Sequence, residues 1–311
     1  MTMASRLYHE RGIRQSDIAT RLGISQPGVS RLLARAQEHG IVRTVVVPPE
    51  GLYPELEEAL ENAYGLRECH VVDVPGGDEA VPRELGVTAA RYLDEGTLWG
   101  PVVGFTSWST TLREMVRALA PVRRAGTTHV VEMLGDLGSP VLQHEAGQAT
   151  LRLARLLGAE PVLLRTPGVV ATRPLRDAAL RDPHVSRALR MLDRVDVAFV
   201  GLGPADLHGP LREGDNFFSA AQLADVRAAG AVGQLDQRFV DARGAPVDTP
   251  LDDLVTAISL DQLRAAGIRV VVGGGVTKRR PLHAALCGGW VDVLVTDLAS
   301  ARHLISRPPA R

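Results

Sequence analysis

Two short segments of the 311-residue chain carry residue types that bind anions. In VVGFTSWSTTLREM (102–115), an apolar run ends in Thr106, Ser107, Trp108, Ser109, Thr110 and Thr111, immediately before a helical pattern. Hydroxyls and free backbone N–H groups at the positive end of a helix suit a phosphate. The same hydroxyls also serve as ordinary helix N-caps, and the sequence leaves both interpretations open.

The second segment is VVVGGGVTKRR (270–280), in which Gly273, Gly274 and Gly275 allow the backbone to approach a ligand closely. Lys278 follows, and it is the only lysine in a chain that otherwise uses arginine for positive charge. A compact ammonium there suits a point charge on a phosphate, or an amine close to a carbonyl group. A single lysine can also persist by chance, so Lys278 indicates a phosphate site only together with the hydroxyl segment at 102–115.

A different chemistry is indicated by QSDIATRLGISQPGVSRLLARAQ (15–37). The pattern predicts a helix from Gln15 to Leu22, a tight turn at Gly23, and a second helix that Ser25 caps. Apolar residues at helical spacing supply a shared buried face, and Ala19 is small enough for two helices to cross closely. Together these features predict a helix-turn-helix that binds double-stranded DNA.

The second helix of this unit presents an amide, hydroxyls and guanidinium groups that suit base edges and phosphates. The predicted DNA-binding residues are Gln15, Ser16, Ser25, Gln26, Pro27, Ser30, Arg31 and Arg35. An ordinary helical hairpin with a solvated basic face is the alternative. Residues 1–43 carry seven arginines against three carboxylates, although the whole chain has a formal net charge of −1. The positive charge is therefore concentrated where phosphates would be met.

Composition limits the remaining classes of function. Cys69 and Cys287 stand alone and the nine histidines are scattered, so neither a disulfide framework nor a metal site is expected, and no cofactor. The apolar runs are too short to span a bilayer and no apolar leader follows the first residues, so we expect a cytoplasmic location and no membrane partner.

Residues that do chemistry need elements to position them, and the pattern after residue 68 supplies these. Apolar runs such as PVVGF (101–105), THVVEML (128–134), VDVAFVGLG (195–203), IRVVVGGG (268–275) and VDVLVTD (291–297) alternate with helical stretches. This order favours an α/β domain with a largely parallel sheet, in which ligands bind beyond the carboxyl ends of the strands.

The segment between the two regions contains a predicted strand, GIVRTVVVPP (40–49), and an amphipathic helix, LYPELEEALENAYGL (52–66). The stripe of Leu56, Leu60 and Tyr64 on this helix suits either a dimer contact or packing on the larger domain. The sequence does not separate these two possibilities.

Known enzyme motifs mostly fail on this chain. GFTSW is not a nucleophile elbow, no phosphate-loop motif is present, and GLG at 201–203 lacks the third glycine of a dinucleotide fingerprint. Asp297 precedes LASARHLI and is more readily explained as an N-cap than as a catalytic acid.

With these pieces in order, the chain resembles the SorC-type sugar-binding transcriptional regulators over nearly its whole length. The matching segments are RQSDIATRLGISQPGVSRLLARAQEHGIV, VGFTSWSTTL, VVEMLGDLG, AAGAVGQLDQRFVDARG, VVGGGVTK and VDVLVTDLASA. The family pattern commonly has an acidic residue where this chain has Gln234, and WG where it has Trp108 and Ser109.

The resemblance implies a winged-helix-like DNA-binding domain at 1–50 and an effector and oligomerisation domain at 51–311, similar in fold to sugar-phosphate isomerases and deaminases. It implies regulation of carbohydrate metabolism, with operator affinity gated by a phosphorylated sugar, in a dimer or tetramer. The effector-binding residues that it implies, together with those predicted above, are Gly104, Ser109, Thr110, Thr111, Glu132, Gln234, Gly273, Gly274 and Lys278.

Two rival functions remain open at this point. One is a sugar-phosphate isomerase or deaminase that has acquired a DNA-binding arm, with Glu132, Asp136 or His144 as its base. The other is a constitutive DNA-binding scaffold whose pocket no longer binds a ligand.

Overall fold

The computed structural model describes residues 1–42, 52–94, 99–122, 126–206 and 216–309. The chain divides into two compact units, residues 1–50 and residues 51–311, and each is described by itself.

The first unit is helical. It contains α1 (Thr2–Ser5), a π-helical turn (Arg6–Glu10), α2 (Gln15–Leu22) and α3 (Gln26–Glu38). Gly23 ends α2 with a left-handed φ of 66°, and Ser25 caps α3 by accepting a hydrogen bond from the Gly28 N–H. The predicted helix-turn-helix is therefore present, with a small core that includes Ile18 and Val29. Most of the predicted strand at 40–49 lies outside the described residues.

The second unit is built on a parallel sheet. Within the described residues its seven strands run in the order β1-β10-β9-β5-β2-β3-β4, and every neighbouring pair is parallel. The strands are β1 (Glu68–Val72), β2 (Val102–Phe105), β3 (His129–Glu132), β4 (Glu160–Val162), β5 (Val197–Phe199), β9 (Ile268–Val272) and β10 (Val293–Asp297). The predicted fold class, a mostly parallel α/β domain after a helix-turn-helix, is confirmed.

Strand residues alternate between two apolar cores, one on each face of the sheet. Val270 and Val272 of β9 pack with side chains of α5, α6 and α7, whereas Val271 packs on the opposite face with α11, α12 and α13. A parallel sheet buried on both faces explains why its strands read as nearly continuous apolar runs.

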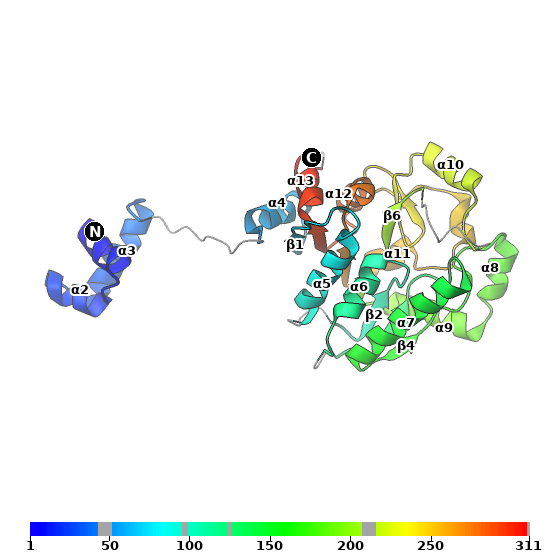
Figure 1. The fold of residues 1–311 in the computed structure, drawn as a ribbon, viewed down its shortest axis with the longest axis horizontal. Coiled ribbons are helices and arrows are strands. Elements are labelled where there is room, and N and C mark those ends of the chain that lie inside the picture. Colours follow the sequence, from blue (N-terminus) through cyan, green and yellow to red (C-terminus); the bar gives the residue numbers. More distant parts are fainter. Residues whose placement is uncertain (43–51, 95–98, 123–125, 207–215, 310–311) are drawn as a thin grey trace. The chain divides into compact units, whose positions relative to one another are not determined.

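The helices and short 3-10 turns of this unit connect the strands, and helices cover both faces of the large sheet (Figure 1). They are α4 (Pro54–Tyr64), α5 (Val81–Asp94), α6 (Thr110–Ala118), α7 (Pro140–Leu157), α8 (Arg173–Ala179), α9 (Pro183–Met191), η2 (Leu192–Arg194), α10 (Ala220–Ala228), η4 (Pro250–Leu254), α11 (Leu260–Ala265), η5 (Val276–Lys278), α12 (Arg279–Cys287) and α13 (Leu298–Ile305). In the described part of the chain, no helix has the length and apolar character needed to cross a membrane.

Helix α4 packs on the larger domain, as one of the two interpretations of its apolar stripe predicts. Leu60 is fully buried in the core on the α13 side of the sheet, and α4 lies beside β1 and α13 (Figure 1). The Tyr64 hydroxyl donates to the carbonyl oxygens of Leu304 and Arg307 at 2.9 Å each. The stripe is therefore part of this domain's own core.

A small antiparallel sheet, β6 (Leu202–Pro204), β7 (Gly233–Leu235) and β8 (Arg238–Val240), completes the unit. The segment VDVAFVGLG, expected as one strand, is divided between β5 of the large sheet and β6 of the small one. The division falls at Gly201, where a Cβ atom would lie 2.5 Å from Thr106 Cγ2 and 2.8 Å from Asp236 Oδ1. Only glycine fits where the chain passes between these side chains.

Candidate functional site

The exposed face of α3 carries most of the predicted DNA-binding residues. Gln26, Ser30, Arg31 and Arg35 are all exposed on it, while Val29, Leu33 and Ala36 point into the core. Ser16, Ser25 and Pro27 are also exposed, and Gln15 is half-buried at the start of α2. The structure thus presents these side chains on one helix-turn-helix unit, as expected.

The guanidinium groups of Arg31 and Arg35 are available for a partner. In the described part of the chain, neither makes a hydrogen bond or an ion pair, whereas Arg6 in the same unit is paired with Glu10 at 3.0 Å. Guanidinium groups that are exposed and unpaired suit phosphates and guanine edges.

The larger unit contains a cavity of about 260 Å³ at the carboxyl ends of β2, β5 and β9. These three strands are neighbours in the sheet. The strands that follow β2 in the chain, β3 and β4, lie on one side of the neighbouring pair β2 and β5. The strands that follow β5, β9 and β10, lie on the other side of this pair. The cavity therefore lies at a topological switch point, the usual ligand site of open parallel sheets.

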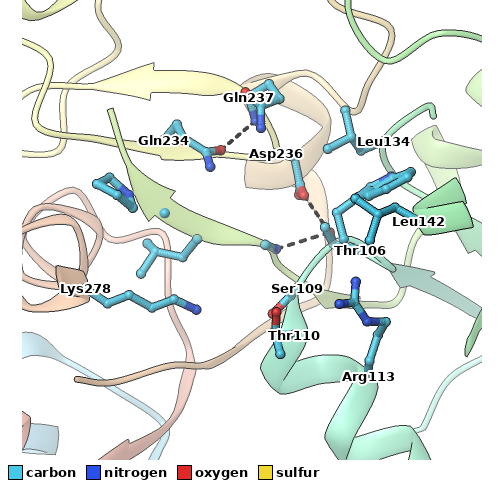
Figure 2. Close-up of a pocket in the computed structure, with 15 residues that line it drawn as sticks. Thr106, Ser109, Thr110, Arg113, Leu134, Leu142, Gln234, Asp236, Gln237 and Lys278 are labelled. Atoms are coloured by element: carbon cyan, nitrogen blue, oxygen red, sulfur yellow. Dashed lines mark hydrogen bonds between the residues drawn. The ribbon is translucent and has the colours of Figure 1, made fainter. Parts of the chain in front are cut away.

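The segments after β2, β3, β5 and β9 line this cavity, together with the hairpin between β7 and β8 and residues of α6 and α7 (Figure 2). Its lining residues are Thr106, Trp108, Ser109, Thr110, Arg113, Leu134, Leu142, Gly201, Leu202, Gly203, Pro204, Gln234, Asp236, Gln237 and Lys278. The volume is slightly below the ~300–1,000 Å³ of typical ligand pockets, so it suits a small ligand.

Lys278 supplies a cation to one side of the cavity. It ends η5 and immediately precedes α12, and Figure 2 shows its ammonium pointing toward Ser109. Its ammonium has no acceptor in the described part of the chain, and burial lowers its pKa from 10.5 to about 8. It therefore remains mostly protonated at pH 7, and it is poised for an anion.

The N-terminus of α6 faces the same space. Ser109 caps this helix by accepting from the Leu112 N–H at 3.4 Å, so the N-cap interpretation of Ser109 is confirmed. Ser109 and Thr110 also line the cavity, so capping and ligand contact coexist there. One turn later Arg113 reaches the cavity and donates to the Ser107 carbonyl at 3.3 Å. Burial lowers the pKa of Arg113, and the nearby Glu145 opposes this shift.

The hairpin between β7 and β8 forms the opposite wall (Figure 2). Its two turn residues, Asp236 and Gln237, both have left-handed φ values of 47° and 66°. The Asp236 carboxylate accepts from the Thr106 hydroxyl at 2.5 Å, and the Gln237 N–H donates to Gln234 Oε1 at 2.7 Å. Burial raises the pKa of Asp236 to about 7, against the lowering effect of the Thr106 hydrogen bond.

Of the predicted effector-binding residues, the structure brings Ser109, Thr110, Gln234 and Lys278 together around this cavity. The other five, Gly104, Thr111, Glu132, Gly273 and Gly274, are not among the residues that line it.

Core packing explains why Gly104, Thr111 and Gly274 lie outside the cavity lining. Gly104 lies inside β2, where a Cβ atom would be 2.6 Å from Met133 Sδ, and Thr111 is buried in α6. Gly274 packs on the Asp297 side chain, because a Cβ atom there would lie 2.1 Å from its Oδ2. The glycine run therefore wraps Asp297, which also accepts from the Gly275 N–H and caps α13.

The carboxyl group of Glu132 is occupied inside the fold. Its Oε1 accepts from the Thr150 hydroxyl at 2.9 Å and its Oε2 from the Leu164 N–H at 2.8 Å. Burial raises its pKa. These bonds join β3 to α7 and to the segment after β4, so both oxygens of Glu132 are engaged inside the fold.

The acid–base residues of the enzyme alternative are likewise away from the cavity lining. Asp136 is paired with Arg165 at 3.0 Å, and His144 is exposed on α7 beside a separate shallow groove. Within the described residues, no three histidine, cysteine, aspartate or glutamate side chains are grouped as metal ligands would be.

Sequence reasoning named Thr106 within the hydroxyl segment at 102–115, but it missed Arg113, Asp236 and Gln237 as pocket residues. A type I′ hairpin usually carries Asn-Gly or Asp-Gly, so the dipeptide Asp236–Gln237 gave no turn signal. For Arg113 a signal existed, because it lies one helical turn after Ser109 and on the same face of α6.

Comparison with known proteins gives consistent matches over both units. The family model described as "Putative sugar-binding domain" matches residues 51–306, and the model for the MarR family matches residues 5–51. The chain is 30% identical over 305 residues to the deoxyribonucleoside regulator of Bacillus subtilis (strain 168), covering 97% of this chain and 96% of that protein.

It is 28% identical over 307 residues to the sorbitol operon regulator of Klebsiella pneumoniae, covering 97% and 96% of the two chains. The crystal structure of that full-length regulator, SorC, matches with a TM-score of 0.74 at 27% identity and covers 97% of each chain.

Proposed function

Because the chain belongs to the SorC-type family of sugar-binding transcriptional regulators, we propose that a phosphorylated sugar gates its binding to operator DNA. The phosphate is held by Lys278 and by the N-terminus of α6 with Ser109 and Thr110. The observation that carries this proposal is the unpaired ammonium of Lys278 across the cavity from these two hydroxyls.

Electrostatics favours a phosphate over a neutral group at this end. Lys278 loses hydration on burial, as its lowered pKa records, and an adjacent dianion restores the stability of its charged form. The first-turn N–H groups of α6 add donors and a partial positive charge. A free sugar offers hydroxyls alone, and gains little from either feature.

The helix-turn-helix supplies the DNA-binding surface of this mechanism. Exposed Arg31 and Arg35 on α3 contact base edges or phosphates, and two such helices in a symmetric oligomer need half-sites about 34–36 Å apart or a multiple of this. We propose a dimer or a tetramer on this ground.

Gating follows from thermodynamic linkage. A ligand that binds differently to the DNA-competent and DNA-incompetent arrangements of the oligomer shifts operator affinity by that difference. A ligand with equal affinity for both arrangements shifts nothing, however tightly it binds.

The test is fluorescence anisotropy of labelled DNA from upstream of the protein's own gene, at fixed salt, across a panel of sugar phosphates and matched free sugars. We expect one phosphorylated sugar to change operator affinity, and Lys278→Met to abolish that change while Arg280→Met, an exposed neighbour, preserves it. An equal response to the free sugar, or an unchanged response in Lys278→Met, would overturn the assignment of the phosphate.

The DNA-binding surface is tested in the same assay. Arg31→Ala should weaken specific binding by about 1–3 kcal/mol if Arg31 reads a guanine edge, and should relax the preference at one base pair. Arg187→Ala, an exposed arginine of the larger unit, is the matched control. Wild-type affinity and sequence preference in Arg31→Ala would show that this residue does not read the operator.

A further inference from the structure

We propose that the ligand of this cavity is a phosphorylated sugar acid, in which a carboxylate lies at the end opposite the phosphate. This inference rests on the proposed function, because it places the phosphate at Lys278 and the N-terminus of α6. It concerns what the remaining wall of the cavity recognises.

The orientation of Gln234 is fixed by a neighbour. Its Oε1 accepts from the Gln237 N–H at 2.7 Å, so its amide nitrogen is the free end of the side chain. Figure 2 shows that nitrogen pointing into the cavity. Gln234 therefore acts as a hydrogen-bond donor to a ligand, although an unconstrained glutamine could donate or accept.

Two further side chains of the lining add only donors. The indole N–H of Trp108 has no acceptor in the described part of the chain, and its ring is buried beside the cavity. Arg113 makes one hydrogen bond, to the Ser107 carbonyl, and its guanidinium has five N–H groups to satisfy. An indole and a guanidinium have no acceptor atom for a ligand proton.

The side-chain acceptors of the hairpin are already used or are shielded. Asp236 Oδ1 takes the Thr106 hydroxyl proton, while Asp236 Oδ2 and Gln237 Oε1 are closed off from solvent. A ligand hydroxyl on this side would leave its own proton without a side-chain acceptor. A carboxylate brings acceptors alone, so it matches the donors of Gln234, Trp108 and Arg113.

The balance of charge agrees with the count of donors. Lys278 and Arg113 both line the cavity, and neither has a carboxylate within ion-pair distance in the described part of the chain. The carboxyl group that does line it belongs to Asp236, whose Oδ1 accepts from Thr106 and whose Oδ2 is buried. Two cationic side chains, Lys278 and Arg113, and one buried carboxyl group, Asp236, suit a ligand that is anionic at both ends.

The experiment compares matched ligands that differ only at the end opposite the phosphate. Isothermal calorimetry on the full chain uses the aldonate, aldose and alditol phosphates of a hexose series and of a pentose series, beginning with 6-phosphogluconate, glucose 6-phosphate and sorbitol 6-phosphate. We expect the aldonate phosphate to bind at least about tenfold more tightly than the alditol phosphate of its series, since charge-assisted hydrogen bonds are roughly twice as strong as neutral ones.

Gln234→Glu provides the sharpest variant. The new side chain keeps an oxygen for the Gln237 N–H and turns the second position from a donor into an acceptor with negative charge. We expect at least about tenfold weaker binding of the aldonate phosphate, with the alditol phosphate unchanged or tighter. Gln222→Glu adds the same charge at the capping box of α10, away from the cavity, and should change neither.

Arg113→Met gives a second, independent readout if Gln234→Glu does not fold. It should weaken the aldonate phosphate more than the alditol phosphate. Equal or tighter binding of the alditol phosphate by the wild-type protein overturns the sugar-acid inference but leaves the phosphate assignment standing. Failure of every phosphorylated probe to bind overturns the proposed function itself, so the two failures are distinguishable.

Discussion

Replacing Lys278 by methionine should make the free protein more stable and should remove the stabilisation that a phosphorylated ligand adds. Burial lowers the pKa of Lys278 from 10.5 to about 8, so the folded state disfavours the ammonium. Below pH 8 both the folded and unfolded states are protonated and the folded state carries the whole cost. As the pH rises from 8 to 10.5 the folded state loses its proton first, and the cost disappears.

The magnitude follows from the size of this shift. At 1.36 kcal/mol for each pKa unit, the cost is about 3 kcal/mol at pH 7 and about 1 kcal/mol at pH 9.5. Lys278→Met removes it and keeps an apolar stem of similar length. We therefore expect the free energy of unfolding to rise by about 3 kcal/mol at pH 7, and by about 2 kcal/mol less than this at pH 9.5.

The chain offers a clean probe for this measurement, because its three tryptophans, Trp99, Trp108 and Trp290, all lie in the unit 51–311. Tryptophan fluorescence during urea unfolding therefore follows that unit alone. A sugar phosphate at 100 times its dissociation constant should add about 2.7 kcal/mol to the wild-type protein and almost nothing to Lys278→Met.

Arg280→Met, which changes an exposed cation two residues away, serves as the control and should show no pH-dependent difference from the wild-type protein. If Lys278→Met were instead less stable by the same amount at both pH values, the side chain would be contributing packing, and the desolvation argument would be refuted. If the ligand stabilised the variant as it does the wild-type protein, Lys278 would not hold the phosphate.

Three further changes test other parts of the structure. Ser25→Ala removes the acceptor of the Gly28 N–H and should lower the stability of the unit 1–50 by about 1 kcal/mol. Part of the far-ultraviolet circular dichroism should then be lost at lower urea while the tryptophan transition is unchanged. Equal shifts of both signals would contradict this expectation. Gly274→Ala places a Cβ atom 2.1 Å from Asp297 Oδ2 and should lower the stability of the unit 51–311 by about 1–3 kcal/mol. An unchanged urea midpoint would show that the loop relaxes without cost. Asp236→Asn should raise the free energy of unfolding by about 4 kcal/mol at pH 8 and by less than about 1 kcal/mol at pH 4. The difference arises because the pKa of Asp236 is raised to about 7, so ionising this carboxyl group destabilises the fold only as the pH rises from 4 to 7. A gain that is independent of pH would exclude this cause.

Local chemistry was sufficient to predict the helix-turn-helix and most of the parallel sheet. The turn at Gly23 and the cap at Ser25 are each decided by neighbouring residues, and the structure shows both. The strands of the large sheet are buried on both faces, so they form continuous apolar runs that are easy to recognise.

The hairpin that forms one wall of the site could not be predicted in the same way. Its turn residues, Asp236 and Gln237, adopt left-handed conformations that glycine and asparagine prefer. Tertiary contacts hold them there, since Asp236 bonds to Thr106 and its N–H donates to the Gly201 carbonyl at 3.0 Å. A turn held by residues 35 and 130 positions away gives no local signal.

Glu132, which the resemblance places at the sugar hydroxyls, shows a second limit of the sequence. An acidic residue at the carboxyl end of a strand is where ligand contacts are expected, yet its two oxygens are satisfied by Thr150 and by the Leu164 N–H. Whether a strand-end carboxylate faces a ligand or the core depends on what packs beside it, and the strand pattern does not contain that information.

The lowered pKa of Lys278 explains why an anionic ligand should be coupled to the stability of this domain. Burial lowers the pKa of Lys278 and raises that of Asp236, so the charged forms of both side chains are disfavoured before any ligand binds. Sites that bind ligands commonly carry such a cost, because the same groups would be better solvated elsewhere. A phosphate beside Lys278 returns its pKa toward 10.5, and binding above pH 8 must therefore take up a proton. This free energy is recovered only when the cavity is occupied. An oligomer that is competent for DNA binding in only one state of the cavity would convert it into a change in operator affinity.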